Sequence, residues 1–164
     1  MSDESHLDVE IDLGQSADAA ALVDFNRAMA RETEDKELDV ETVTAGVATL
    51  LAEPARGFYV VARQGGALVG SLMITKEWSD WRCGDFWWIQ SVYVRPTARR
   101  QGVYRRLYEF VQARAAGADN VCGFRLYVER DNHRAQQTYE ALGMHESVYR
   151  MYEAPAAHGL SSYP

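Results

Sequence analysis

A short arginine-rich loop is the part of this sequence best suited to binding an anion. Arg99 and Arg100 precede Gly102, and Arg105 and Arg106 follow it in the first turn of a predicted helix. A helix N-terminus exposes backbone N–H groups and carries a partial positive charge. Arginine side chains around such a terminus predict a site for a phosphate or pyrophosphate group.

The charges along the chain divide into an acidic and a basic part. Residues 1–53 hold 14 acidic and 3 basic side chains, net −11, whereas residues 95–134 hold 9 arginines and 4 acids, net +5. The whole chain carries −7, which argues against a general nucleic-acid or anionic-membrane binder. The basic part is therefore suited to a small anionic ligand, with a solvated basic helix face as the alternative.

Known phosphate-binding motifs do not match the basic loop. It lacks the Gly-Lys-Ser/Thr sequence of a P-loop and the three glycines of a dinucleotide fingerprint.

Cys83 and Cys122 are expected to be free thiols, with a single disulfide bridge between them as the alternative. No metal site is predicted, because metal-ligand spacing is absent among His6, His145 and His158 and between them and the cysteines.

Four tryptophans lie within eleven residues, at positions 78, 81, 87 and 88. Aromatic rings form apolar walls and bind cations on their faces, so Trp88 together with Gln90 is a candidate lining for an amine pocket. The alternative is that two of the four fill the core and the other two brace a hairpin.

The length and composition predict one globular domain. The chain has 164 residues and 18.5 kDa, with 47% hydrophobic and 25% charged side chains, as in soluble proteins. We expect a single domain over 1–164, with a core at about 8–152 and short flexible tails. No apolar stretch approaches the roughly 18 residues of a membrane span, and the N-terminus is acidic, so a cytoplasmic location is expected.

Hydrophobic periodicity predicts the elements that position these residues. Helical spacing occurs at 16–30, 40–51, 103–117 and 133–142, with a polar connection at 31–38. Alternating or apolar runs predict strands at 9–13, 58–62, 67–74, 86–94 and 121–128, and one or two more within 144–152. This order predicts an α/β (α+β) fold with a mixed, mostly antiparallel sheet of six to seven strands and helices on both faces.

Two stretches resemble signatures of the GNAT superfamily of acetyl-CoA-dependent N-acetyltransferases. The basic loop is similar to its pyrophosphate-binding signature, as Arg99-x-x-Gly102-x-Tyr104. About thirty residues later, the chain is similar to the family's second signature, with Asn132-x-x-Ala135-x-x-x-Tyr139-x-x-x-Gly143-Met144. The resemblance covers roughly residues 8–152 and implies a GNAT-like sheet that splays between the strands ending at Val94 and Val128.

The resemblance implies acetyl-CoA as cosubstrate. The backbone of Val92 and Val94 would pair with the pantetheine arm, main-chain N–H groups from Arg100 to Arg105 would hold the pyrophosphate, and Asn132 would bond the pantetheine. The implied cofactor-binding residues are Val92, Tyr93, Val94, Arg99, Arg100, Gln101, Gly102, Val103, Tyr104, Arg105 and Asn132.

Two catalytic roles are also implied by the resemblance. The backbone N–H of Val92 would stabilise the oxyanion of the tetrahedral intermediate, and Tyr139 would donate a proton to the departing thiolate. Asn132 and Tyr139 are seven residues apart, so they share one face of a helix. Neither cysteine lies in a catalytic-looking context, which favours direct attack in a ternary complex.

The sequence departs from the family pattern at two places. Tyr104 stands where the family has glycine or alanine; we expect its ring to turn outward, with packing on the neighbouring strand as the alternative. Carboxylates that often serve as the general base are replaced by Trp88 and Tyr127, so the base is unassigned. Glu32 and Glu34, in the predicted connection, are candidates for binding the acceptor, with an exposed acidic loop as the alternative; further candidates are Asp85 and Glu129.

The expected function is transfer of the acetyl group of acetyl-CoA to a primary amine. The acceptor is expected to be a small-molecule or peptide amine, and the acidic N-terminal third favours a cationic one. Nucleic-acid and membrane partners are not expected, and a homodimer is left open. The alternative function is a catalytically silent acyl-CoA-binding regulatory module, because the base is missing and Tyr104 is unusual.

Overall fold

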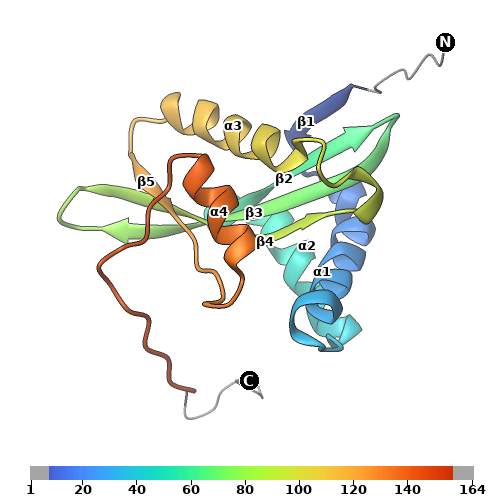
Figure 1. Ribbon diagram of the computed structural model, residues 1–164, viewed down its shortest axis with the longest axis horizontal. Coiled ribbons are helices and arrows are strands. Elements are labelled where there is room, and N and C mark those ends of the chain that lie inside the picture. Colours follow the sequence, from blue (N-terminus) through green and yellow to red (C-terminus); the bar gives the residue numbers. More distant parts are fainter. Residues whose placement is uncertain (1–7, 157–164) are drawn as a thin grey trace. The chain divides into compact units, whose positions relative to one another are not determined.

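The computed structural model describes residues 8–156 (Figure 1). By their contacts these residues form two compact units, which meet in sequence between Tyr127 and Val128. The predicted N-terminal tail, residues 157–164 of the predicted C-terminal tail, and the two histidines at positions 6 and 158 lie outside the described residues. Over the described range, no helix is long and apolar enough to cross a membrane.

The first unit contains one sheet of five strands in the order β1-β2-β3-β4-β5. Its strands are β1 (Val9–Leu13), β2 (Gly57–Gln64), β3 (Ala67–Ser79), β4 (Gly84–Val94) and β5 (Val121–Arg125). Neighbouring strands are antiparallel, except that β4 and β5 are parallel. The prediction of a mixed, mostly antiparallel sheet is therefore correct in kind.

The predicted count of six to seven strands is wrong. Strand β5 ends at Arg125, before Val128, and residues 144–152 form no strand although their apolar residues alternate. Val148, Tyr149 and Tyr152 are 92%, 75% and 89% exposed. An alternating sequence becomes a strand only where a neighbouring strand supplies hydrogen bonds and a buried face, and this segment has neither among the described residues.

Helices cover both faces of the sheet (Figure 1). Helices α1 (Ala19–Glu34) and α2 (Val40–Ala52) pack on one face, and α3 (Val103–Ala116) packs on the other. The α1–α2 side has a core of Leu22, Val23, Phe25, Val47, Leu50, Tyr59, Val61, Leu68 and Tyr93. The α3 side buries residues at helical spacing, namely Val103, Leu107 and Val111.

Between residues 128 and 156 the second unit contains one helix, α4 (His133–Ala141), as predicted. Asn132 caps its start, because its side-chain oxygen accepts a hydrogen bond of 3.1 Å from the N–H of Ala135. The helix ends before Gly143, which has a φ of 89°. The N–H of Met144 then donates to the carbonyl of Tyr139 at 3.1 Å, so the last turn is closed by the chain that follows it.

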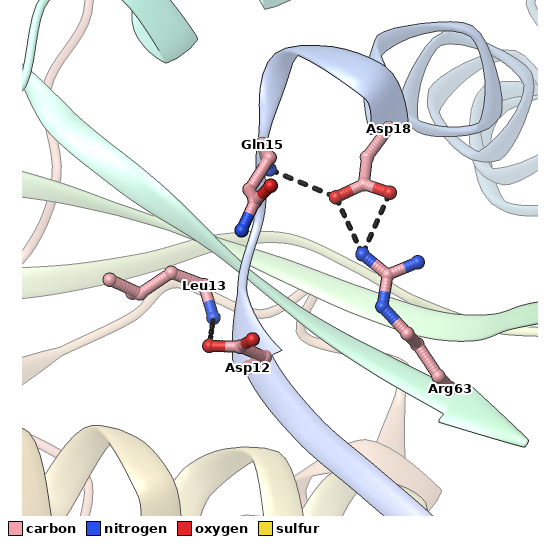
Figure 2. A network of polar contacts seen from close by, with 5 residues as sticks. All are labelled: Asp12, Leu13, Gln15, Asp18 and Arg63. Carbon is pink, nitrogen blue, oxygen red and sulfur yellow. Dashed lines mark hydrogen bonds and ion pairs between the residues drawn. The ribbon is translucent and has the colours of Figure 1, made fainter. Parts of the chain in front are cut away.

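A buried carboxylate ties the start of α1 to the sheet (Figure 2). Asp18 ends a short 3-10 turn, η1 (Ser16–Asp18), and is 5% exposed. Both of its carboxylate oxygens lie 2.8 Å from the Nη2 of Arg63 on β2, and one accepts the N–H of Gln15 at 2.9 Å. The 3-10 turn and its bond to Arg63 therefore set where α1 begins.

Replacing Asp18 by asparagine should destabilise the protein by about 2 kcal/mol, because it leaves the guanidinium of Arg63 without its counter-charge in a mostly buried place. The control is Asp12→Asn, since Asp12 is exposed and accepts only the N–H of Leu13. We expect that change to stay within about 0.5 kcal/mol. Urea unfolding followed by circular dichroism measures both, and equal midpoints would contradict the role given to Asp18.

Candidate active site

Strand β4 is irregular at the position where the resemblance places the oxyanion. Its register with β3 shifts between Ser71 and Met73, so that Ser91 and Val92 of β4 together oppose one residue of β3. Ser91 has a φ of 49°, a left-handed conformation that residues other than glycine seldom adopt. This arrangement is a β-bulge, which removes the backbone of these two residues from the regular ladder.

Strands β4 and β5 run together for only part of their length. Their pairing begins with Asp85 opposite Val121 and ends with Trp88 opposite Arg125, the last residue of β5. In the part of the chain that the structure describes, residues 89–94 of β4 therefore have no strand partner on this side. The bulge lies within this segment, and so does the backbone expected to meet the pantetheine arm.

The basic loop leads from the end of β4 into α3. It contains a 3-10 turn, η2 (Pro96–Ala98), and two left-handed residues, Arg100 with a φ of 64° and Gly102 with a φ of 75°. Gly102 is the N-cap of α3, and within residues 8–156 no side chain caps this terminus. A Cβ built on Gly102 meets no atom within 4 Å, so lack of space is not the reason for glycine here. The reason is the left-handed backbone, which glycine adopts without strain.

The arginines of the loop differ in their partners. Arg99 pairs with Glu32 on α1 at 2.7 Å, and Arg106 pairs with Asp8 at 2.9 Å. Arg100 and Arg105 are exposed and form no ion pair within residues 8–156. Two cationic side chains beside the start of α3 are thus available for an anion.

The side chain of Arg99 contacts the end of β4 as well as Glu32 of α1. Its Nε donates to the carbonyl of Val94 at 2.8 Å, and its guanidinium lies 5.6 Å from the centre of the Tyr93 ring. The hydroxyl of Tyr93 donates to Glu32 at 3.5 Å. Burial, and then the negative charge of Glu32, raise the pKa of Tyr93, so its hydroxyl stays protonated at neutral pH.

Glu32 and Glu34 do not lie in a connection, because α1 continues to Glu34. Glu32 contacts the basic loop through Arg99, whereas Glu34 lies 3.3 Å from Lys36. The structure therefore brings together Glu32, which was predicted to bind the acceptor, and Arg99, which was predicted to bind the cofactor. Both residues are about 40% exposed, at 41% for Glu32 and 40% for Arg99.

The ring of Tyr104 does not turn outward, contrary to the expectation. It is half-buried and stacks on Tyr108 of the same helix, with ring centres 6.4 Å apart and planes 7° apart. These residues are four apart, so they lie on one face of α3. The ring therefore packs along its own helix.

Trp88 and Gln90 belong to a cluster that spans β3, β4 and β5. The Nε1 of Trp88 donates to Glu77 at 3.4 Å, and the amide of Gln90 donates to the hydroxyl of Thr75 at 2.9 Å. The rings of Trp88 and Tyr127 lie 6.2 Å apart. Glu77 was not among the sequence candidates, because it lies beyond the predicted strand 67–74. Strand β3 continues to Ser79, and its two-residue period places Glu77 on the same face as Thr75.

The other tryptophans lie apart from this cluster. Trp87 is buried in the α3-side core, whereas Trp78 and Trp81 are 60% and 90% exposed near the turn between β3 and β4. Of the further base candidates, Asp85 accepts a hydrogen bond from Asn120 at 3.2 Å. Glu129 is exposed and belongs to the second unit.

The second unit carries Asn132 and Tyr139 on α4. The side-chain oxygen of Asn132 is used as the helix cap, which leaves its amide nitrogen to donate to a ligand. Tyr139 is half-buried, and burial raises the pKa of its hydroxyl above the ordinary value. The group is therefore protonated at neutral pH, as a proton donor must be.

Metal-ligating residue types are dispersed over the described residues. None of their histidines, cysteines and carboxylates gather in a group of three or more that could hold a metal ion. Cys83 and Cys122 are free, as predicted. A cavity of about 560 Å³ lies where α2 and α3 end, and no predicted site residue lines it.

The model of the Acetyltransferase (GNAT) family matches residues 20–144. No curated protein matches the sequence. Among solved structures, a possible acetyltransferase from Clostridium difficile 630 is 42% identical, with a TM-score of 0.86 over 92% of this chain and 99% of that one.

More distant structures share the fold. A ribosomal-protein-alanine N-acetyltransferase from Brucella melitensis biovar Abortus 2308 is 17% identical, with a TM-score of 0.74 over 92% of this chain and all of that one. AAC(6')-Iy in complex with a bisubstrate analogue is 15% identical, with a TM-score of 0.72 over 92% of this chain and 99% of that one. The family match and the 42% identical structure show that this chain belongs to the GNAT acetyltransferase family.

Proposed function

We propose that this protein transfers the acetyl group of acetyl-CoA to a primary amine by direct attack in a ternary complex. One observation on the described part of the chain carries the proposal. A bulged strand segment without a strand partner there leads, through a short basic loop, into a helix N-terminus that no described side chain caps. The pantetheine arm of CoA is an extended amide chain that ends in a pyrophosphate. It therefore needs a strand-like partner followed by an anion-binding site. The family match spans both units, so we propose that they act as one domain.

The residues present suit acetyl-CoA. The backbone of Val92 and Val94 offers hydrogen-bonding groups to the pantetheine arm in the manner of an added strand. The loop from Arg100 to Arg105 supplies backbone N–H groups, the positive end of the α3 dipole and two exposed guanidinium groups for the pyrophosphate. Asn132 donates its side-chain amide to the pantetheine.

The reaction forms a C–N bond and breaks a C–S bond. The neutral amine attacks the thioester carbonyl carbon, and the N–H of Val92 stabilises the oxygen that becomes negative. The intermediate then collapses, the sulfur leaves with the bonding electron pair, and Tyr139 supplies its proton. The amine nitrogen loses a proton to solvent water, since no carboxylate of β4 stands at the bulge, and Tyr139 regains its proton from solvent, so that the amide and the CoA thiol are the net products.

The second candidate function is an acyl-CoA-binding module without catalysis. Trp88 and Tyr127 favour it, because neither side chain is a base at neutral pH. The two functions share the cofactor and differ only in the reaction.

Two measurements test the proposal. Saturating CoA at a hundredfold excess over Kd should stabilise the fold by about 2.7 kcal/mol and raise the melting temperature. Mixing the protein with acetyl-CoA and a panel of primary amines should release free thiol and yield an acetylated amine by mass spectrometry. A shift in melting temperature without thiol release would favour the silent module, and no shift at all would overturn the cofactor assignment.

Exchanging Arg100 and Arg105 together for glutamine should weaken CoA binding by about tenfold and reduce its salt dependence, because two free cations are lost beside the pyrophosphate. The control is Arg106→Gln, since Arg106 is already paired with Asp8. Isothermal titration at two salt concentrations measures both. Equal losses in the double variant and the control would contradict a specific role for the two free arginines.

Exchanging Glu32 and Glu34 together for glutamine should raise KM for a cationic amine and weaken its salt dependence, because two negative charges are removed. Glu32 also bonds Arg99, so the CoA dissociation constant decides between two roles. A change in KM with constant CoA affinity supports acceptor attraction. A change in CoA affinity alone would instead make Glu32 a positioning residue of the loop.

A further inference from the structure

We propose that the cavity where α2 and α3 end is a second ligand site, which takes a small monocarboxylate with an apolar or aromatic body. The cavity has a volume of about 560 Å³, which is within the range of small-molecule sites. All of the residues that line it belong to the first unit. A ligand there is independent of the acetyl-transfer reaction.

Most of the residues that line the cavity are apolar. Leu13 of β1 and Leu50 of α2 line it together with Phe58 of β2 and Trp87 of β4. The rings of Phe58 and Trp87 meet edge to face, with centres 5.2 Å apart and planes at 79°. Trp87 is 5% exposed and Leu50 is 7% exposed, so packing holds both side chains in place. These residues offer a preformed wall to an apolar or aromatic group.

Two cationic side chains from different elements line the same cavity. Lys76 comes from β3, and its Nζ donates to the carbonyl of Pro54 at 3.2 Å. Arg114 comes from the last turn of α3, and its guanidinium lies 5.3 Å from the centre of the Phe58 ring. Both side chains are exposed, so they lie at the opening of the cavity, and within residues 8–156 neither forms an ion pair. These contacts leave N–H donors of both groups available to an anion.

The charge around the cavity suits an anion with a single negative charge. The C-termini of α2 and α3 each carry a partial charge of about −0.5, and the two cationic side chains outweigh them by about one positive charge. No acidic residue of the described chain lines the cavity. Of the carboxylates nearest in sequence, Glu53 is paired with Arg56, and Asp119 is exposed and lies outside the lining. A monocarboxylate fits this balance, whereas a phosphate dianion or an ammonium group does not.

The cavity lies far from the basic loop. Arg114 is in the last turn of α3, whereas Gly102 caps the first turn of the same helix. A helix of 14 residues is about 20 Å long. A carboxylate in the cavity should therefore bind without displacing CoA.

Naphthylacetate is a suitable probe, because it joins one carboxylate to an aromatic body. Isothermal titration should show saturable binding, with equal affinity in the absence and presence of saturating CoA. The isosteric neutral naphthylacetamide should bind about tenfold more weakly, because it forms no ion pair with the two cations. Acetate should not bind measurably, because it lacks the apolar body.

The amide NMR signals of three glycines locate the probe. Gly57 and Gly117 line the cavity, so their signals should shift as naphthylacetate is added. The signal of Gly102, in the basic loop, should stay in place. If the signals of Gly57 and Gly117 change with protein concentration and not with naphthylacetate, a second copy of the chain covers the cavity and the proposal is wrong.

The variants Lys76→Gln and Arg114→Gln should each weaken naphthylacetate binding by about threefold, as expected for ion pairs open to solvent. The affinity for naphthylacetamide should not change in either variant, which would show that the cavity stays intact. The control is Arg82→Gln, since Arg82 is also exposed, lies 5.2 Å from the centre of the Phe86 ring and is outside the cavity. Absence of saturable binding, displacement by CoA, equal affinity for the acid and the amide, or equal losses in Arg82→Gln would each overturn the proposal.

Discussion

Replacing Tyr139 by phenylalanine should lower kcat on the order of 100-fold, or about 3 kcal/mol in the barrier, with little change in CoA affinity. The ring keeps its packing, and only the proton donor is lost. This loss in kcat is at the low end of what general acid catalysis contributes, because a thiolate whose conjugate acid has a pKa of about 8.5 to 9 is already a good leaving group. Steady-state kinetics and isothermal titration with CoA measure the two quantities.

The pH dependence of the activity is a second test of the role of Tyr139. Burial raises the pKa of Tyr139 above 10.0, so any loss of activity due to its ionisation lies above pH 10.0. Tyr149→Phe is the control, since Tyr149 is 75% exposed and outside both signatures. Full activity in Tyr139→Phe would remove the hydroxyl from the mechanism, and lost CoA binding would make it a residue of the cofactor site.

Replacing Gly102 by valine should raise the CoA dissociation constant at least tenfold. Gly102 has a φ of 75°, and a β-branched residue in this left-handed region costs at least about 1–2 kcal/mol, so the loop would change its backbone conformation. The N–H groups at the start of α3 would then lose their common direction toward the pyrophosphate. The melting temperature without ligand should fall only slightly, because the loop is exposed.

A matched variant separates conformation from bulk. Gly102→Asn places a side chain in space that is open for 4 Å around the Cβ, and asparagine tolerates the left-handed region. It should therefore bind CoA nearly as the wild type does. If valine and asparagine weaken binding equally, steric contact with the ligand would be the cause, and unchanged affinity in both would contradict a pyrophosphate site at this loop.

The sequence predicted the elements with strong periodicity and missed those that depend on distant partners. The helices over 103–117 and 133–142 were placed within one or two residues, because apolar spacing and the flanking glycines define them locally. The alternation in 144–152 predicted a strand where none forms, since alternation alone does not supply a pairing strand. The bulge at Ser91 was not predicted, because nothing in its neighbourhood marks a left-handed serine.

The candidate site shows the same division. The Gly102 loop could be found from sequence because its residues are contiguous. The pair formed by Glu77 and Arg125 could not, since 48 residues separate the two side chains and only strand order brings them together. The bond between Glu32 and Arg99, 67 residues apart, was missed for the same reason, and it joined two residues assigned to different ligands.

The bulge of β4 also bears on self-association. A strand segment with an unpaired side is an edge, and edges recruit strands from other chains into aggregates. Here the left-handed Ser91 interrupts the regular spacing of N–H and C=O groups, and Pro96 follows just beyond the strand. A second copy of the chain cannot continue a regular ladder past such an interruption. The irregularity proposed to serve ligand binding thus also makes this side of β4 a poor template for a strand from another chain.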